Sequence, residues 1–343
     1  MKKAIEAALK KIKKNARGRT TAFVIGNTSD LFLQDRFYET PMRETPELIY
    51  SGVIVRDVVT ACAVARLVDD KVDYVFVDDE KKVRKMYYGA NDVGNIEKAV
   101  RNIVAQSTLL TYKGNDITVE AVDALVCNLV SEVSGTRIAI IGMGNFGSKV
   151  ALKLVERGVH INAYRRDQNK LRTICTGLNQ IKSKDTISKI IPAKSIVAAC
   201  RGAEIVIGIT NEKGVIKKAM LKHAAPGVIL IDAGKGCFAE EVAQDLSHLI
   251  YRVDVSIIQK HIFLGLIHAR EHMQKSLGRR HIQKLGGTII STGLLAQRGE
   301  IVVNDIKRPT VVVGIAAKGG VLERNTPHIQ KQIAEIKKFF KIK

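Results

Sequence analysis

The chain has 343 residues, of which 46% are hydrophobic, and it carries a formal net charge of +21 at pH 7. This length is sufficient for two domains with cores of their own, and no run of about 18 apolar residues is present, which excludes a transmembrane helix. The amino terminus lacks the apolar core of a signal peptide, and the five cysteines are scattered without a CxxC pair. We therefore expect buried free thiols and a cytoplasmic protein.

Positive charge is concentrated at the two ends of the sequence. Residues 1–20 hold eight Lys or Arg and one Glu, and residues 331–343 hold five Lys and one Glu, so these segments carry 11 of the 21 net charges. Such a charge attracts nucleotides, anionic metabolites, RNA and anionic lipid, although a generally lysine-rich composition gives the same excess. There is no Trp and no RNP-like aromatic cluster. We expect at most weak, non-specific contact of the termini with RNA or anionic lipid.

The first third of the chain predicts a basic helix and a small α/β domain. Ala4, Ala8, Leu9 and Ile12 share one face of a helix over residues 2–17, which would lie on the body of the protein or on a partner. The next elements in order are a strand at 22–26, a polar loop at 27–47, a helix at 53–68, a strand at 72–77, a helix at about 95–106 and a strand at 107–112. Strands alternating with helices predict a parallel sheet. A helix over 117–133, capped by Asp116 or Thr118, would connect this domain to the next.

Residues 137–167 contain the most informative motif. A strand at 138–141 meets Gly142-Met143-Gly144-Asn145-Phe146-Gly147, and a helical pattern and a second strand at 159–163 follow. A GxGxxG inside a strand–turn–helix–strand unit of about 30 residues is typical of a dinucleotide-binding Rossmann turn. Gly142 permits the tight turn, Gly144 lets the backbone approach a pyrophosphate, and Gly147 lets the helix pack closely on the strand. The N–H groups at the helix start, around Asn145 and Phe146, favour phosphate. The alternative is a βαβ unit that binds no nucleotide.

The residues after the second strand distinguish NAD from NADP. An NAD site places a carboxylate there for the ribose hydroxyl, whereas an NADP site places arginine there for the 2′-phosphate. This chain has Tyr164-Arg165-Arg166-Asp167, so two guanidinium groups stand where the carboxylate is expected. A register shift of two would restore an NAD-like carboxylate at Asp167, and a solvated loop is the other alternative. We predict NADP.

The rest of the chain continues the α/β pattern and then becomes rich in strands. The predicted elements are helices at 188–200 and 215–223, strands at 204–209, 228–232 and 249–255, a helix at 260–285, β-rich pieces at 288–326 that form a hairpin or edge strands, and a last helix at 328–340 that could fold back on the first domain. His268 and His272 share a helical face, but the sequence is not HExxH and no third ligand is spaced to match. We expect no metal.

The expected fold is therefore α/β, with a Rossmann-type doubly wound parallel sheet, a smaller amino-terminal α/β domain and a β-rich carboxy-terminal extension. The expected parts are a basic amphipathic helix (1–20), an amino-terminal substrate domain (21–116), a connecting helix (117–134), an NADP-binding Rossmann domain (135–285) and a β-rich segment with a final helix (286–343).

This order of parts resembles the two-domain NAD(P)-dependent dehydrogenases, a group that includes shikimate dehydrogenase, methylene-tetrahydrofolate dehydrogenase, the dipicolinate synthase dehydrogenase subunit and alanine dehydrogenase. The segments ITVEAVDALVCNLVSEVSGTRIAIIGMGNFG (117–147) and GAEIVIGIT…GVILIDAGKG (202–236) carry the resemblance, which covers about residues 100–240 at the superfamily level. The resemblance implies that Thr210 and the Gly234–Gly236 turn lie beside the nicotinamide ribose and ring.

Candidate catalytic residues lie where predicted strands end, because ligands bind beyond the carboxyl ends of parallel strands. They are Thr210, Asn211, Asp232, Lys235 and Asp254 in the Rossmann domain, and Asn27, Asp78, Asp79, Lys113, Asn115 and Asp116 in the first domain. Hydride transfer at a carbonyl or alcohol needs a proton donor or base, and we predict Lys113 with Asp116 for this role. Lys235, flanked by glycines, would meet a substrate carboxylate. The alternatives are a plain turn and helix cap at 113–116 and an ordinary loop lysine at 235.

These observations predict an NADP-dependent oxidoreductase that transfers hydride to or from a small anionic metabolite, such as a carboxylic, amino or keto acid. The alternative is a non-catalytic NADP(H)-binding sensor or scaffold whose basic termini contact an anionic partner. By analogy with similar enzymes we expect a homodimer.

Overall fold

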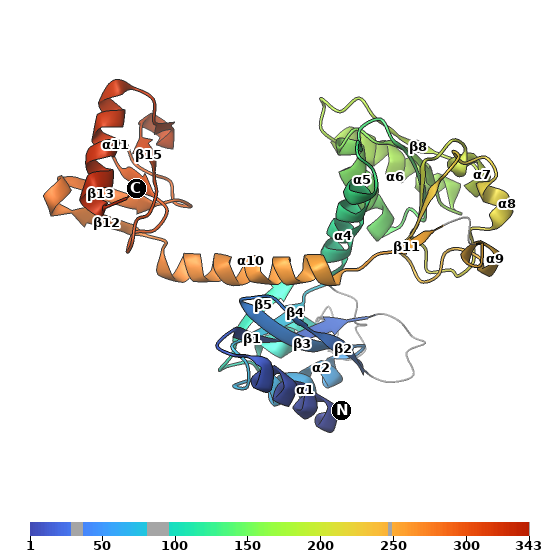
Figure 1. The fold of residues 1–343 in the computed structure, drawn as a ribbon, viewed down its shortest axis with the longest axis horizontal. Coiled ribbons are helices and arrows are strands. Elements are labelled where there is room, and N and C mark those ends of the chain that lie inside the picture. Colours follow the sequence, from blue (N-terminus) through green and yellow to red (C-terminus); the bar gives the residue numbers. More distant parts are fainter. Residues whose placement is uncertain (29–36, 81–95, 246–248, 343) are drawn as a thin grey trace. The chain divides into compact units, whose positions relative to one another are not determined.

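The computed structural model describes residues 1–28, 37–80, 96–245 and 249–342. The chain divides into two compact units, Met1–His261 and Ile262–Lys343, and each is described by itself (Figure 1). The first unit contains two sheets and the second contains one. Among the described residues, no helix is both long enough and apolar enough to cross a membrane. The predicted α/β class, with a doubly wound sheet, a smaller amino-terminal α/β part and a β-rich carboxy-terminal part, is confirmed.

The amino-terminal part is built on a five-stranded sheet. In the order in which they lie side by side, its strands are β2 (Phe37–Glu44), β3 (Leu48–Val55), β1 (Thr20–Asn27), β4 (Tyr74–Asp78) and β5 (Thr108–Tyr112). The strands β3, β1, β4 and β5 are parallel to one another, as predicted, and β2 is antiparallel to β3. The carboxyl ends of the parallel strands therefore meet at one edge of this sheet.

The predictions for residues 37–55 were wrong. The polar segment 37–44 is not a loop but the edge strand β2, with Pro41 at a bulge between Thr40 and Arg43. An edge strand has few buried residues and tolerates proline at a bulge, so it lacks the usual strand pattern. Strand β3 is buried on both faces, which removes the alternation of polar and apolar residues. Its apolar end was mistaken for the first turn of the helix that follows.

Three helices cover one face of this sheet: α1 (Lys2–Asn15), α2 (Val58–Val68) and α3 (Ile96–Arg101). They bury apolar side chains, such as Ile12 of α1 and Val64 of α2, against Phe23 and Ile25 of β1. Helix α2 begins at 58 because the Asp57 carboxylate accepts a 2.7 Å hydrogen bond from the Thr60 N–H. The basic helix α1 thus packs on its own domain.

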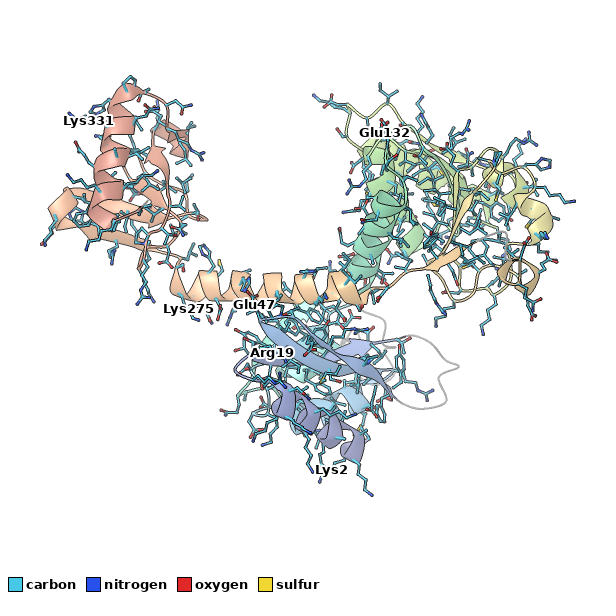
Figure 2. The ribbon with its side chains drawn as sticks, in the orientation of Figure 1. Lys2, Arg19, Glu47, Glu132, Lys275 and Lys331 are labelled. Carbon is cyan, nitrogen blue, oxygen red and sulfur yellow. The ribbon has the colours of Figure 1, made fainter. Side chains whose placement is uncertain are left out.

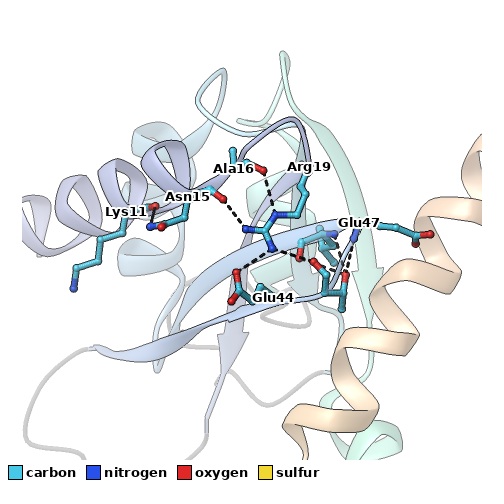
Figure 3. A network of polar contacts seen from close by, with 8 residues as sticks. Lys11, Asn15, Ala16, Arg19, Glu44 and Glu47 are labelled. Carbon is cyan, nitrogen blue, oxygen red and sulfur yellow. Dashed lines mark hydrogen bonds and ion pairs between the residues drawn. The ribbon is translucent and has the colours of Figure 1, made fainter.

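Arg19 fastens the end of α1 to the sheet (Figure 3). Its guanidinium donates to the carbonyls of Asn15 (2.6 Å) and Ala16 (3.1 Å), which have no partner inside the helix, and to the Glu44 carboxylate (2.9 Å) at the end of β2. The lysines of α1 remain exposed, and Lys2 projects from this helix in Figure 2. The helix is held by its apolar face and by Arg19, which leaves its charged face to solvent.

Asp69, directly after α2, fastens the segment that leads into β5. Its carboxylate accepts hydrogen bonds from the N–H groups of Ala105 (2.9 Å), Gln106 (3.0 Å) and Ser107 (2.8 Å). Burial tends to raise the pKa of Asp69, but the backbone donors outweigh burial and hold the pKa below its usual value. The ionised carboxylate therefore stabilises the folded state.

We expect Asp69→Asn to lower the free energy of unfolding by about 2 kcal/mol at pH 7. Because the folded-state pKa is depressed, this stabilisation is complete above the unfolded-state pKa of Asp and is lost as pH falls through the folded-state pKa. The difference between parent and variant in urea unfolding should therefore shrink below about pH 4. The control is Asp70→Asn, since Asp70 pairs with Lys71 at the surface; it should change stability by less than about 0.5 kcal/mol. A difference for Asp69→Asn that stays constant down to acid pH would contradict this account.

The second sheet is a parallel sheet of six strands. In spatial order they are β11 (Ile250–Arg252), β10 (Ile229–Asp232), β9 (Ile205–Gly208), β6 (Arg137–Ile141), β7 (His160–Tyr164) and β8 (Ile190–Pro192). Its helices are α4 (Gly114–Leu129), α5 (Asn145–Glu156), α6 (Gln168–Ile181), α7 (Ile196–Cys200), α8 (Lys218–Leu221) and α9 (Glu240–Ala243). One apolar cluster joins α4, α5 and α6 to the sheet, and another joins α7, α8 and α9. The sheet is thus covered on both faces, as in doubly wound folds.

Two helix predictions in this region were wrong or too long. Residues 188–200 contain the edge strand β8 followed by the short helix α7, and residues 215–223 contain only the four-residue helix α8. Strand β8 is three residues long with two exposed positions, so its sequence does not alternate for long enough to indicate a strand. The connecting helix α4 begins at Gly114 after Lys113, and neither Asp116 nor Thr118 caps it.

Acidic side chains of α4 face basic side chains of α5. The pairs are Asp116–Lys149 (2.5 Å), Glu120–Lys153 (2.7 Å) and Asp123–Arg157 (2.6 Å). Asp123 is buried, and its second carboxylate oxygen accepts another bond from Arg157, at 2.7 Å. Apolar residues such as Val122 and Val126 pack beneath these α4–α5 ion pairs. Helix α4 therefore follows the last strand of the first sheet in the chain but packs in the core of the second sheet.

The carboxy-terminal unit is a separate sheet covered by one helix. Helix α10 (Ser256–Lys275) leads into it, and its strands are β12 (Arg279–Ile282), β13 (Gly287–Ser291), β14 (Ile301–Val303), β15 (Val312–Ala316) and β16 (Leu322–Glu323), in spatial order, with short 3-10 turns at Gln283–Leu285 and Lys318–Gly320. Strands β13 and β14 are parallel and the other pairs are antiparallel. The last helix, α11 (Pro327–Phe340), packs Ile329 and Ile336 on this sheet.

Two expectations for this unit were wrong. The helix predicted over 260–285 ends at Lys275. Beyond it, Gly278 adopts a φ of +155° and the chain turns into β12. The last helix covers its own sheet, where Ile289, Ile301 and Val303 offer an apolar face. The β-rich segment is therefore a small unit with its own core rather than a hairpin added to another sheet. Lys331 projects from α11 (Figure 2).

Candidate functional site

The turn between β6 and α5 brings backbone atoms unusually close together. Gly142 has a φ of +118°, and a Cβ atom there would lie 2.0 Å from the carbonyl oxygen of Ile209, which follows β9. A Cβ atom on Gly147 would lie 2.1 Å from the carbonyl oxygen of Gly142. Only glycine fits these two positions, so they hold the helix tightly against the end of the strand.

Gly144 has the opposite surroundings. It is exposed, it precedes the first residue of α5, and a Cβ atom there would meet no atom within 4 Å. No side chain caps the amino terminus of this 12-residue helix. The N–H groups at the start of α5, beside exposed Asn145 and half-buried Phe146, thus adjoin open space. Unsatisfied N–H groups and the positive end of the helix dipole form a site suited to an anionic ligand.

A cavity of about 500 Å³ opens beside this turn, at the carboxyl ends of β6, β7 and β9. The residues that line it are Ile141, Gly142, Met143, Gly144, Tyr164, Arg165, Arg166, Asp167, Ile196, Ile209, Thr210, Asn211, Glu212 and Val215. It thus brings together five of the predicted cofactor-binding residues. The other three, Asn145, Phe146 and Gly147, belong to the adjoining first turn of α5.

The residues after β7 differ in what they contact. Arg165 donates a 2.6 Å hydrogen bond to the carbonyl of Met143, inside the glycine turn, so its guanidinium group lies between the strand end and the turn. Arg166 forms an ion pair with Glu212, which follows β9. Asp167 precedes α6, and its carboxylate accepts a 3.0 Å bond from the Lys170 N–H. The carboxylate that would suit an NAD ribose is therefore used as a helix cap.

Thr210 and the turn at Gly234–Gly236 are joined by Cys237. The Thr210 N–H donates to the Cys237 sulfur at 3.4 Å, and Asp232 shapes the turn by accepting from the N–H groups of Gly234 (3.0 Å) and Gly236 (2.9 Å). Burial raises the pKa of Cys237 to about 11, so the thiol stays protonated at neutral pH. Lys235 is exposed on this turn. The ends of β9 and β10 are thus held together by a buried thiol.

The predicted Lys113–Asp116 pair has other neighbours in the structure. The Asp116 carboxylate binds the Lys149 ammonium group of α5 at 2.5 Å. Lys113 is exposed, and its charge acts on Asp79, at the end of β4. Burial raises the pKa of Asp79, and the charge of Lys113 opposes that rise. Both predicted residues therefore stand at the junction of β5 and α4, and Asp116 pairs with Lys149.

The polar residues at the end of the first sheet mainly support one another. Asn27 donates a 2.8 Å hydrogen bond to the Glu80 carbonyl, and Asp78 accepts from the Glu80 N–H at 3.0 Å. The Asn115 N–H lies 3.4 Å from the Glu80 carboxylate. After β11 of the second sheet, Asp254 accepts a 2.8 Å bond from the Ser256 N–H at the start of α10. These contacts tie together the loops after β1, β4 and β5 and fix the entry into α10.

Comparison with known proteins identifies the second sheet. Residues 137–257 match the family described as the NAD binding domain of 6-phosphogluconate dehydrogenase. These residues form an NAD(P)-binding Rossmann domain. No curated protein sequence matches this chain.

The chain also has similarity to solved structures. Ornithine carbamoyltransferase from Gloeobacter violaceus is 15% identical, with a TM-score of 0.43 over 76% of this chain and 90% of that chain. L-tryptophan dehydrogenase from Nostoc punctiforme is 9% identical, with a TM-score of 0.40 over 73% of this chain and 74% of that chain. Phosphoglycerate dehydrogenase from Lactobacillus plantarum is 13% identical, with a TM-score of 0.32 over 60% of this chain and 78% of that chain.

Sequence reasoning missed three residues of this site. The Met143 carbonyl accepts a hydrogen bond from Arg165, and Glu212 forms an ion pair with Arg166. Cys237 links the ends of two strands through its hydrogen bond from the Thr210 N–H. Glu212 lies two residues after Thr210, at the end of a predicted strand, and that position alone makes it a candidate. A backbone carbonyl and a buried thiol give no comparable signal, because their roles depend on which loops lie side by side.

Proposed function

We propose that the protein is an NADP-dependent oxidoreductase that transfers hydride to or from a small anionic metabolite, such as a carboxylic, amino or keto acid. The observation that carries the cofactor preference is the pair Arg165 and Arg166, which lines the cavity directly after β7 while Asp167 caps α6. A guanidinium group can bind a 2′-phosphate through two parallel hydrogen bonds, whereas an NAD site offers a carboxylate at this strand end.

The residues present fit a dinucleotide. The open space over Gly144 and the uncapped N–H groups of Asn145, Phe146 and Gly147 would hold its pyrophosphate. Thr210, which also lines the cavity, would lie beside the nicotinamide ribose. When bound, the cofactor would supply or accept the hydride. The protein would contribute binding and orientation, which are the main roles of such a domain.

Lys113, Asp116 and Lys235 are the proposed catalytic residues. Lys113 would donate or accept the proton that accompanies hydride transfer. Asp116 would stabilise this region through its contact with Lys149. Lys235, exposed on the turn after β10, would bind the substrate carboxylate. Residues 21–116 would then form the substrate domain. The NADP-binding domain, predicted over 135–285, would end with the first unit at His261, because β12 (Arg279–Ile282) belongs to the carboxy-terminal sheet.

Titration of the purified full chain with NADPH and NADH tests the cofactor proposal. We expect preferential binding of NADPH, and a loss of about 100-fold in NADPH affinity in the Arg165→Ala/Arg166→Ala variant, because two charge-assisted interactions with the 2′-phosphate are removed. NADH affinity should change by less than about fivefold. The matched control is Arg137→Ala/Arg201→Ala, which removes two exposed arginines near the amino ends of β6 and β9, whereas the cavity lies at the carboxyl ends of the strands.

Equal affinity of the parent for NADH and NADPH would contradict the choice of NADP. A screen of carboxylic, amino and keto acids for oxidation or reduction of the bound cofactor then tests catalysis. Tight NADPH binding without turnover of any of them would favour a sensor or scaffold over an enzyme.

A further inference from the structure

We propose that Glu212 is a specificity-determining residue that competes with the 2′-phosphate of NADP(H) for Arg166. The ion pair between Arg166 and Glu212 joins the loop after β7 to the loop after β9, and both residues line the cavity. This inference rests on the proposed function, and it concerns how strongly the site discriminates between the two dinucleotides.

The charges at the cavity support this role. The charged side chains among the described residues that line it are Arg165, Arg166, Asp167 and Glu212, so two positive charges are balanced by two negative ones. Asp167 already accepts the Lys170 N–H, and Arg165 is directed at the Met143 carbonyl. Arg166 is the arginine held by a carboxylate. The strength with which Arg166 attracts a phosphate therefore depends on Glu212.

The pair is exposed enough to be exchanged. The side chains of Arg166 and Glu212 are 83% and 54% exposed, so water replaces either partner at little cost and the ion pair itself is weak. A 2′-phosphate carries close to two negative charges, which attract Arg166 more strongly than one carboxylate does. Binding of NADPH would thus break the ion pair between Arg166 and Glu212, and the cost of breaking it would lower the net affinity for NADPH. NADH, without this phosphate, would leave the pair intact.

The Glu212→Gln variant tests the proposal. We expect its affinity for NADPH to rise by about fivefold at low ionic strength, while its affinity for NADH changes by less than about twofold. The gain should fall in about 0.5 M salt, because exposed charges are then screened within a few ångströms. The control is Glu204→Gln, which removes the same charge from a pair with Arg137 at the amino ends of β6 and β9, away from the cavity. It should leave both affinities unchanged.

A second pair of variants separates competition from simple repulsion. If Glu212 acts by holding Arg166, Glu212→Gln will have no effect on NADPH affinity once Arg166 is replaced by glutamine. If the gain persists in the Arg166→Gln background, Glu212 repels the phosphate directly and the proposed competition is wrong. A loss of NADPH affinity in Glu212→Gln would also overturn the proposal, since the ion pair would then be orienting Arg166 for the ligand.

The outcomes also distinguish this inference from the proposed function. A parent protein that binds neither dinucleotide, or that binds both equally, contradicts the proposed cofactor. A parent that prefers NADPH while Glu212→Gln behaves as the parent leaves the cofactor assignment intact and removes only the role of Glu212.

Discussion

Replacing Gly142 with alanine is expected to lower the free energy of unfolding of the Rossmann domain by about 4 kcal/mol. The residue has a φ of +118°, and the new Cβ atom would lie 2.0 Å from the carbonyl oxygen of Ile209. This oxygen belongs to the backbone, so it moves only if the end of β9 moves with it. Urea unfolding followed by circular dichroism measures the change.

Gly144→Ala is the matched control for Gly142→Ala. Gly144 has a negative φ and its added Cβ atom would face open space, so stability should fall by less than about 1 kcal/mol. The same methyl group would stand where the dinucleotide is proposed to approach the backbone, and NADPH binding should weaken. Equal loss of stability in the two variants would show that the tight packing around Gly142 is not what the turn depends on.

Removing the carboxylate of Asp123 is expected to cost about 3 kcal/mol in the free energy of unfolding. Asp123 is 5% exposed and accepts bonds of 2.6 and 2.7 Å from Arg157, so Asp123→Ala leaves the guanidinium group without its main partner. The exposed part of Arg157 regains water, which keeps the loss at the lower end of the range for buried pairs. The change is again measured by urea unfolding.

Glu120→Ala provides the comparison on the same helix. Glu120 is 46% exposed and pairs with Lys153 at 2.7 Å, and an exposed pair of this kind contributes less than about 1 kcal/mol. The two variants remove one acid each from the α4–α5 ion pairs and differ mainly in burial. If Glu120→Ala destabilises the protein as much as Asp123→Ala, burial is not the reason that Asp123 matters.

The Rossmann half was predictable because its signals are local. A glycine spacing, an apolar strand on either side and a helical pattern between them lie within 137–163, and each follows from backbone geometry that neighbouring residues impose. Strands β6, β7, β9 and β10 were found within two residues of their ends. The strands that were missed, β2, β3, β8 and β12, are either edge strands or buried on both faces, and neither kind alternates.

The amino-acid sequence by itself determined the strand–glycine–helix turn at 142–147 and the arginines that follow the next strand. The sequence did not determine which charged side chains form ion pairs with one another. Asp116 binds Lys149, Arg166 binds Glu212 and Asp123 binds Arg157, each across at least 33 residues of chain. Only the tertiary structure decided these pairs, because a charge on a long side chain takes the partner that packing brings within about 4 Å, whatever the sequence places beside it.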